Sequence, residues 1–238
     1  MLAYGAIIIS AVGVAVCIAR YSQRGLGLSS TERLGVGLGA FCGAMIGAKL
    51  PFVFSDWNEF LSGAAWFSNG KTILLGMVGG YFGVETAKWC LGVRVRTGDS
   101  FVVPVAAAIA IGRLGCFVGG CCYGTPTDLP WGVVFPHVDP LPRHPTQIYE
   151  SIFHATCAIV LAIVLHNGWC RGNLMKLYII LYAAYRFATE FIRPEARFLG
   201  GWTAYQFASI VLAIGFGCLW WRDARLMNKV QLPSKSVE

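Results

Sequence analysis

Charged residues are scarce in this chain. Lys, Arg, Asp and Glu make up 13% of the 238 residues, whereas hydrophobic residues make up 56% and the mean hydropathy is +0.59. Soluble domains carry about 25% charged residues. A soluble fold of this size lacks the interior to hide so much apolar surface, whereas a lipid bilayer removes the need to hide it. The scarcity excludes an ordinary soluble domain and indicates an integral membrane protein.

A basic patch is also lacking, although the formal net charge is +7. The basic residues stand singly between apolar runs and are not interleaved with aromatic residues. This distribution excludes nucleic acid as a partner. In a membrane protein, a basic excess reflects cytoplasmic loops and contact with anionic lipids.

The start of the chain lacks the features of a removable signal peptide. Met1 stands almost directly before an apolar stretch, and Ala3-Tyr4-Gly5 does not resemble a cleavage site. We therefore expect a retained first helix. We also find no internal repeat, and we expect a single transmembrane domain over residues 1–238.

Long apolar runs, in contrast, are plentiful, and a transmembrane helix needs about 20 such residues. Glu85 and Lys88 interrupt the third run, where their i, i+3 spacing favours a structural pair on one helix face. Gly37, Gly39, Gly43 and Gly47 allow close helix packing. The sequence predicts an all-α, polytopic membrane bundle of about seven transmembrane helices. The expected spans are residues 2–19, 34–54, 72–93, 101–118, 148–166, 174–191 and 202–221.

Basic residues are unevenly distributed among the predicted loops. Most follow the first, third and fifth spans or lie in the tail, as Arg24, Arg94, Arg171 and Arg225 do. Cytoplasmic loops are enriched in Lys and Arg. We therefore expect the N-terminus outside, the C-terminus in the cytoplasm, and a polar loop at about residues 119–146 facing outward.

Arg113 lies near the end of the fourth predicted span. An ionisable residue at membrane depth costs free energy and by default marks function. Arginine suits a bidentate grip on phosphate, and the neighbouring Gly112, Gly115, Gly119 and Gly120 allow a close approach of backbone to ligand. The same pattern also fits an arginine that extends to the membrane surface beside flexible glycines.

A dense polar segment, residues 143–150, opens the fifth span. Pro145 suits a first helical turn. His144 is a candidate general acid or base, because its unperturbed pKa lies near neutrality. A capped helix entry with a merely hydrogen-bonded histidine is the alternative, but the density of polar side chains favours function.

Arg186, Glu190 and Arg193 follow at i, i+4 and i+7, which predicts one helical face. In such a row the one carboxylate neutralises one of the two arginines, so one positive charge remains for a ligand. A purely structural ion network is the alternative. Several arginines that converge on an outward site in an apolar bundle indicate an anionic amphiphile. A phospholipid is the obvious candidate.

Cys116, Cys121 and Cys122 cluster near the polar loop, whereas most other cysteines lie in apolar runs as small hydrophobes. Together with His137 and His144 they could bind a metal, but the spacing of the cysteines is not a standard zinc pattern, so no metal is predicted. A disulfide, or a redox-active or acyl-accepting thiol, is favoured over a metal. A small packing residue is the alternative for Cys116.

These motifs together resemble the bacterial prolipoprotein diacylglyceryl transferase family, in order and along nearly the whole chain. Gly112-Arg113-Leu114-Gly115-Cys116-Phe117 is similar to the family's Gly-Arg-x-Gly-Asn-Phe, a signature that ends at Gly124. Residues 143–150 are similar to its Arg-His-Pro-Ser-Gln-Leu-Tyr-Glu. The remaining matches are residues 4–5, residues 47–50 with Lys49 in place of an arginine, and residues 186–194.

The resemblance implies a transfer of diacylglyceryl from phosphatidylglycerol to a thiol of a lipoprotein precursor, or to another outward nucleophile, in the bacterial cytoplasmic (inner) membrane. Glycerol phosphate would leave, and no cofactor is expected. Arg113 and Arg186 would hold the phosphate as negative charge develops, with His144 as a candidate base. The implied lipid-binding residues are Tyr4, Lys49, Gly124, Arg143, Gln147, Tyr149, Glu150, Glu190 and Arg193.

The chain departs from the family at the His-Gly-Gly motif of the third span, which is Val78-Gly79-Gly80 here. Valine neither accepts a proton nor donates a hydrogen bond. Two alternatives follow from this departure and from the cysteines: a phospholipid-binding protein of the same fold with altered catalysis, and a thiol-redox membrane protein that uses Cys121 and Cys122.

Overall fold

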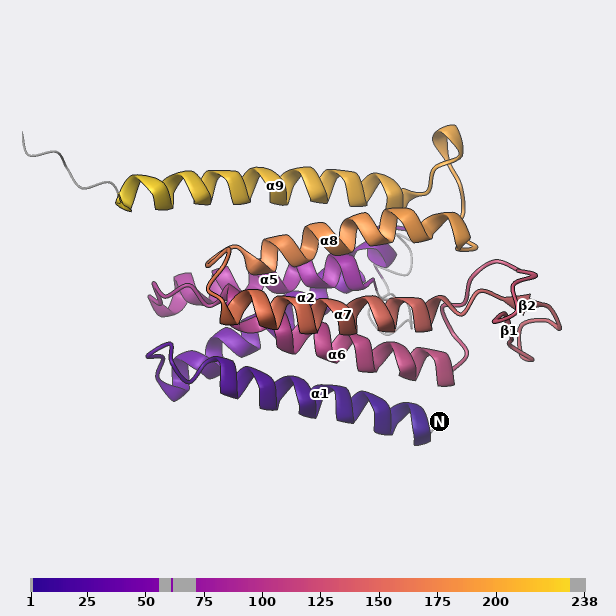
Figure 1. The fold of residues 1–238 in the computed structure, drawn as a ribbon, viewed down its shortest axis with the longest axis horizontal. Helices are drawn as coiled ribbons and strands as arrows, with labels where there is room; N and C mark the ends of the chain where they lie inside the picture. The colour runs from indigo at the N-terminus through magenta and orange to yellow at the C-terminus, as the bar shows by residue number, and fades with distance from the viewer. Residues whose placement is uncertain (1, 56–60, 62–71, 232–238) are drawn as a thin grey trace, which may run out of the picture.

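Seven α-helices run alongside one another in the part of the chain that the structure, a computed structural model, describes: residues 2–55, 61 and 72–231 (Figure 1). Residues 1, 56–60, 62–71 and 232–238 of the predicted domain lie outside the described ones. The helices are α1 (Leu2–Ser22), α2 (Ser30–Ser55), α5 (Ile73–Leu91), α6 (Gly98–Val118), α7 (Thr146–His166), α8 (Leu174–Thr189) and α9 (Ala204–Gln231). The predicted all-α membrane bundle is confirmed.

Five of these helices are long and apolar enough to cross a membrane: α1, α2, α6, α7 and α9. The other two are less suited to crossing alone. Helix α8 has 16 residues and is therefore about 24 Å long, and α5 carries the exposed pair Glu85–Lys88. The Nζ of Lys88 lies 3.0 Å from the Glu85 carboxylate, which confirms the predicted i, i+3 pair.

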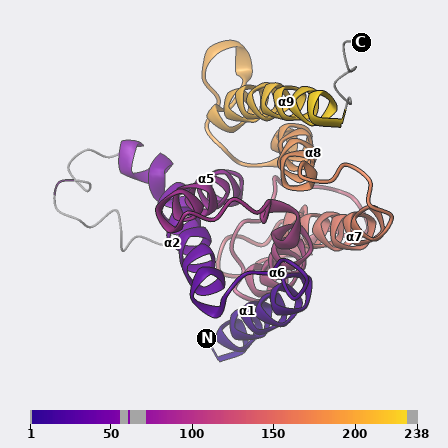
Figure 2. The ribbon, with the colours of Figure 1, turned by 90° about the vertical axis from the view of Figure 1, so that its left-hand side faces the viewer.

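Viewed along their axes, the helices form neighbouring pairs (Figure 2). Helix α2 packs against α5, α1 against α6, α6 against α7, and α8 against α9. The apolar core lies between α5, α6, α7, α8 and α9, and its largest fully buried side chains are Tyr178 and Tyr182. Helices α1 and α9 leave many large apolar side chains exposed, as expected of helices that face lipid.

Glycines bring α2 and α5 into backbone contact. A Cβ added at Gly43 would lie 2.3 Å from the carbonyl oxygen of Gly79, and one at Gly79 would lie 2.2 Å from that of Gly43. A Cβ added at Gly39 or Gly47 would also lie 2.6 or 2.3 Å from α5, which confirms the predicted close packing at these positions. Gly37 has open space around it and takes no part in this seam.

The segment between α6 and α7 projects beyond one end of the bundle. It holds the short antiparallel strands β1 (Val133–Val134) and β2 (Pro142–Arg143), in which Val133 pairs with Arg143. The start of α1 lies at this same end, whereas α9 runs to the opposite end (Figure 1).

Helix α8 ends earlier than the sequence predicted. A 3-10 turn, η1 (Glu190–Ile192), follows it, and Arg193 is extended with φ −104° and ψ 146°. A proline disfavours the helical region for the residue before it, and Pro194 follows Arg193. The prediction that Arg186, Glu190 and Arg193 share one helical face is therefore wrong for Arg193. The remaining 3-10 turn, η2 (Leu199–Gly201), precedes α9.

Candidate functional site

A carboxylate on α7 joins two arginines from different elements. Glu150 is completely buried. Its Oε2 accepts a hydrogen bond at 2.8 Å from Nη2 of Arg193, after η1, and forms an ion pair with Nη2 of Arg113 on α6. The Tyr182 hydroxyl on α8 donates to the other carboxylate oxygen. Charge-assisted bonds of this kind hold guanidinium groups in a defined orientation.

Arg186 on α8 has a carboxylate of its own. Its Nη2 lies 2.8 Å from Glu190 Oε2, one helical turn later. Thr203 Oγ1 donates to Glu190 Oε1 at 2.9 Å, which fixes the carboxylate from the start of α9. The guanidinium also lies over the ring of Tyr205, 4.7 Å from its centroid, as in a cation–π contact.

These three arginines line one cavity of about 1000 Å³. Three guanidinium groups face two buried carboxylates here, and the exposed carboxylate of Glu195 also lines the cavity. Each guanidinium also keeps a buried nitrogen without a hydrogen-bond partner among the described residues: Arg113 Nε, Arg186 Nη1 and Arg193 Nε. Three arginines that line one cavity favour an anion there, because guanidinium groups bind anionic oxygens strongly.

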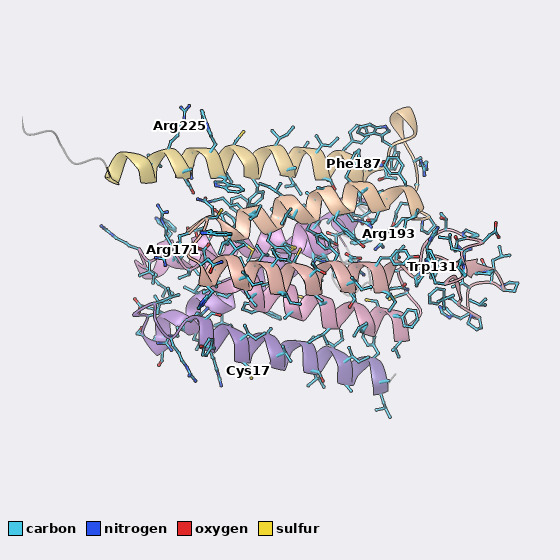
Figure 3. All side chains as sticks on the ribbon, viewed as in Figure 1. Cys17, Trp131, Arg171, Phe187, Arg193 and Arg225 are labelled. Carbon is cyan, nitrogen blue, oxygen red and sulfur yellow. The ribbon has the colours of Figure 1, made fainter. Side chains whose placement is uncertain are left out.

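The rest of the lining contains both apolar and polar side chains from most of the helices. Arg193 lies toward the end of the bundle beyond which β1 and β2 project (Figure 3). The cavity therefore offers an anion site beside apolar helices, which suits an amphiphile. Besides the arginines and three cysteines, the lining residues are Tyr4, Gly5, Phe52, Thr72, Ile73, Leu74, Val118, Gly119, Tyr182, Glu195 and Tyr205.

Three thiols lie next to the arginines. The sulfur atoms of Cys116, Cys121 and Cys122 are all within 4.8 Å of one another, and all three cysteines are free. Hydrogen bonds from the Cys116 and Cys121 thiols lower the pKa of Cys122, with Arg113 and Arg193 acting in the same direction. Hydrogen bonds with Cys116 and Cys122 raise the pKa of Cys121. The positive charges of Arg113 and Arg193 thus favour a thiolate in this cluster.

The first turn of α7 holds the loop that carries two of these thiols. Thr146 Oγ1 donates to the Cys122 carbonyl at 2.6 Å, and Gln147 Nε2 donates to the Cys121 carbonyl at 2.5 Å. Gly124 lies against this turn, where an added Cβ would come within 2.6 Å of His144 Cβ. Thr146, Gln147 and Gly124 therefore shape the cavity wall without lining it.

Other predicted site residues support the projecting segment. Arg143 pairs with Asp139, and this hydrogen bond lowers the pKa of Asp139. His144 Nδ1 lies 3.4 Å from the Tyr149 hydroxyl, which accepts from Trp131 Nε1 at 2.7 Å. None of Arg143, His144 and Tyr149 lines the cavity.

Two further positions lie on the helices beside the cavity. Lys49 is buried on α2, one turn before the lining residue Phe52. Val78 on α5 packs against the apolar core, one turn after the lining residue Leu74.

Tyr182, Thr203 and Tyr205 were not predicted as site residues. Tyr182 stands four residues before Arg186 on α8, and this i, i+4 spacing was a usable signal. Thr203 and Tyr205 follow the two-glycine turn of η2, and nothing in their local sequence connects them with the arginines.

Apolar helices around a cavity with buried arginines define a multi-pass membrane protein with an arginine-lined cavity. The chain belongs to the prolipoprotein diacylglyceryl transferase family, a family of transferases, and the family model matches residues 1–222. It is a bacterial membrane protein.

Similar proteins carry the same family description. The chain is 31% identical over 205 residues to the phosphatidylglycerol--prolipoprotein diacylglyceryl transferase of Clostridium tetani, covering 82% of this chain and 81% of that one. It is 33% identical over 197 residues to the Coxiella burnetii (strain RSA 331 / Henzerling II) protein of the same description, covering 75% of this chain and 74% of the other.

Proposed function

We propose that this protein transfers diacylglyceryl from phosphatidylglycerol to a cysteine thiol of a prolipoprotein at the outer face of the bacterial inner membrane. The observation that carries the proposal is the cavity of about 1000 Å³ that Arg113, Arg186 and Arg193 line together beside apolar side chains. The names of the relatives supply the donor and the acceptor.

The reaction breaks the bond between a glyceryl carbon and a phosphate oxygen. Negative charge develops on the departing glycerol phosphate, and donors aimed at that charge lower the barrier. Arg113 and Arg186 are proposed to hold the phosphate, and Arg193 to supply the third guanidinium. Tyr4 and Phe52 are proposed to border the lipid, while Glu150 and Glu190 position the arginines.

The proposed orientation sets the N-terminus and the segment at about residues 119–146 outside, and the C-terminus in the cytoplasm. The distribution of Lys and Arg supports it. Arg171 and Arg225 lie toward the end of the bundle away from β1 and β2 (Figure 3), so the arginine cavity and the basic loops occupy opposite ends.

The test is transfer of labelled diacylglyceryl from phosphatidylglycerol to a lipobox peptide by the purified protein. Arg113→Ala and Arg186→Ala should each lower the rate at least about 100-fold, the size expected for loss of a charge-stabilising donor. Arg94→Ala, an exposed arginine after α5, is the matched control and should keep the wild-type rate. No transfer and no released glycerol phosphate from the wild-type protein would refute the proposal.

The valine at position 78 favours a second candidate, a phospholipid-binding protein without turnover. Such a protein would co-purify with phosphatidylglycerol, lose the lipid in Arg113→Ala, and release no glycerol phosphate. Val78→His restores the family's residue, and a gain of transfer in that variant alone would favour this second candidate.

A further inference from the structure

The cysteine cluster has the dimensions of a metal site. Four-coordinate zinc binds thiolates at about 2.3 Å, which separates tetrahedral sulfurs by about 3.8 Å. The sulfurs of Cys116, Cys121 and Cys122 lie within 4.8 Å of one another. They therefore need to close by about 1 Å at most to share one ion.

The backbone is already bent so that two neighbouring thiols reach the same point. Successive side chains of an extended chain point to opposite sides, but Cys122 has φ 62°, in the left-handed region. That conformation is strained for a non-glycine residue and persists where the surroundings hold it. The hydrogen bonds from Thr146 and Gln147 to the carbonyls of Cys122 and Cys121 supply this support.

The charge of the cavity suits a metal–thiolate group. Three thiolates and one divalent cation carry a net charge of −1, so the group is an anion that arginines can stabilise. Arg113 Nη1 lies 3.9 Å from the Cys116 sulfur. A guanidinium at this position stabilises an anionic group, and buried charges need such partners.

We propose that Cys116, Cys121 and Cys122 bind one thiophilic divalent cation, Zn²⁺ by preference, and that the acceptor thiol occupies its fourth coordination position from the cavity. Zinc sites with three protein ligands keep the fourth position open for substrate. The part that concerns the acceptor thiol rests on the proposed transferase function; the metal site itself does not.

The bound ion would activate the acceptor thiol, which the valine at position 78 cannot do. A thiol attacks as its thiolate, and a thiol that coordinates zinc is deprotonated outright. The acceptor thiol gives its proton to water as its sulfur binds the metal, so it needs no histidine at position 78. Its sulfur lone pair then forms the bond to the glyceryl carbon, the carbon–oxygen bond breaks, and glycerol phosphate leaves with that electron pair toward the arginines. Nothing is oxidised or reduced.

Metal binding is tested without any assay of activity. Purified protein is freed of metal with a chelator and titrated with Co²⁺, whose thiolate complexes show a charge-transfer band. We expect one Co²⁺ per chain, displaced by Zn²⁺. Cys116→Ser, Cys121→Ser and Cys122→Ser should each weaken binding at least about 100-fold, because each removes a direct ligand.

Cys90→Ser is the matched control, because Cys90 is an exposed cysteine near the far end of α5, and it should bind as the wild type does. The wild-type titration does not depend on how well a variant folds. Absence of the band in the wild-type protein, or its persistence when all three cysteines are serine, would overturn the metal site.

The acceptor position is tested with two peptides. A lipobox peptide should shift the Co²⁺–thiolate band, and the same peptide with serine in place of cysteine should not. A band that neither peptide shifts, or undiminished transfer by metal-free protein, would overturn the role in thiol binding and leave the proposed transferase intact. A shift with the cysteine peptide but no transfer would support thiol binding and count against the transferase alone.

Discussion

Two guanidinium groups share the single carboxylate of Glu150, and this sharing has a measurable consequence. Replacing Glu150 with glutamine leaves Arg113 and Arg193 buried without their counter-charge. Breaking a buried ion pair from one side costs about 3–5 kcal/mol. We therefore expect Glu150→Gln to lower the thermal unfolding temperature of the purified protein markedly and to abolish transfer.

Glu85→Gln is the control for this change. The Glu85 side chain is 46% exposed and pairs only with its helical neighbour Lys88 among the contacts of the described residues. A helical i, i+3 pair of this kind contributes about 0.2–0.5 kcal/mol. Equal effects of the two substitutions would show that Glu150 does not hold the arginines in the way described.

The Arg186 site makes a second residue-scale prediction. Lysine keeps the charge but loses the planar fork and the contact over Tyr205. We expect Arg186→Lys to lower transfer at least about 10-fold, chiefly through weaker retention of phosphatidylglycerol. Tyr205→Phe keeps the ring under the guanidinium and should retain most activity; assays of lipid binding and of rate with both variants separate the two contributions.

At this scale, sequence alone predicts contacts within a helix and misses contacts between helices. The pair Arg186–Glu190 follows from i, i+4 spacing, and the structure contains it. The pair Arg113–Glu150 does not follow from spacing, because it depends on how α6 packs against α7. Proposed roles for His144 likewise depended on a side-chain direction that spacing does not define, and its ring lies beside Tyr149.

Helices α2 and α5 meet through glycine backbones, so adding one methyl group should have different effects on stability at two glycines of α2. Gly43→Ala places a Cβ 2.3 Å from the Gly79 carbonyl oxygen, whereas Gly37→Ala on the same helix meets open space. Overpacking costs about 1–3 kcal/mol. We expect Gly43→Ala to be destabilising and Gly37→Ala to be neutral or slightly stabilising, as alanine favours helix.

Thermal unfolding of both purified variants in the same detergent measures this difference. Equal stability of the two variants would mean that α2 and α5 do not approach as closely as described. The seam matters to the site because Phe52 on α2 and the first residues of α5 line the arginine cavity.

Element boundaries show where hydrophobic runs are informative and where they are not. A long apolar run predicts a helix well, because the backbone must satisfy its own hydrogen bonds in lipid. The same run does not predict where α8 ends. The α-helix ends at Thr189, a 3-10 turn follows, and Arg193 is extended before Pro194. That early end directs Arg193 back to Glu150.

On the scale of the whole molecule, the bundle has two chemically different ends. One end holds the start of α1, the segment with β1 and β2, and the arginine cavity, whereas Arg171 and Arg225 lie toward the other (Figure 3). A phospholipid enters such a site only from the leaflet that this end faces. The orientation in the membrane therefore decides which leaflet supplies the donor.

Reporter fusions test this orientation. Alkaline phosphatase is active only outside the cytoplasm, so a fusion after Asp128 should be active, whereas fusions after Arg94 and after the C-terminus should be inactive. Green fluorescent protein at the C-terminus should fluoresce. The reverse pattern would set the arginine cavity at the cytoplasmic face, where precursors anchored outside could not reach it. The donor site and the acceptor would then lie on opposite sides of the bilayer. The proposed transfer to prolipoproteins would be untenable.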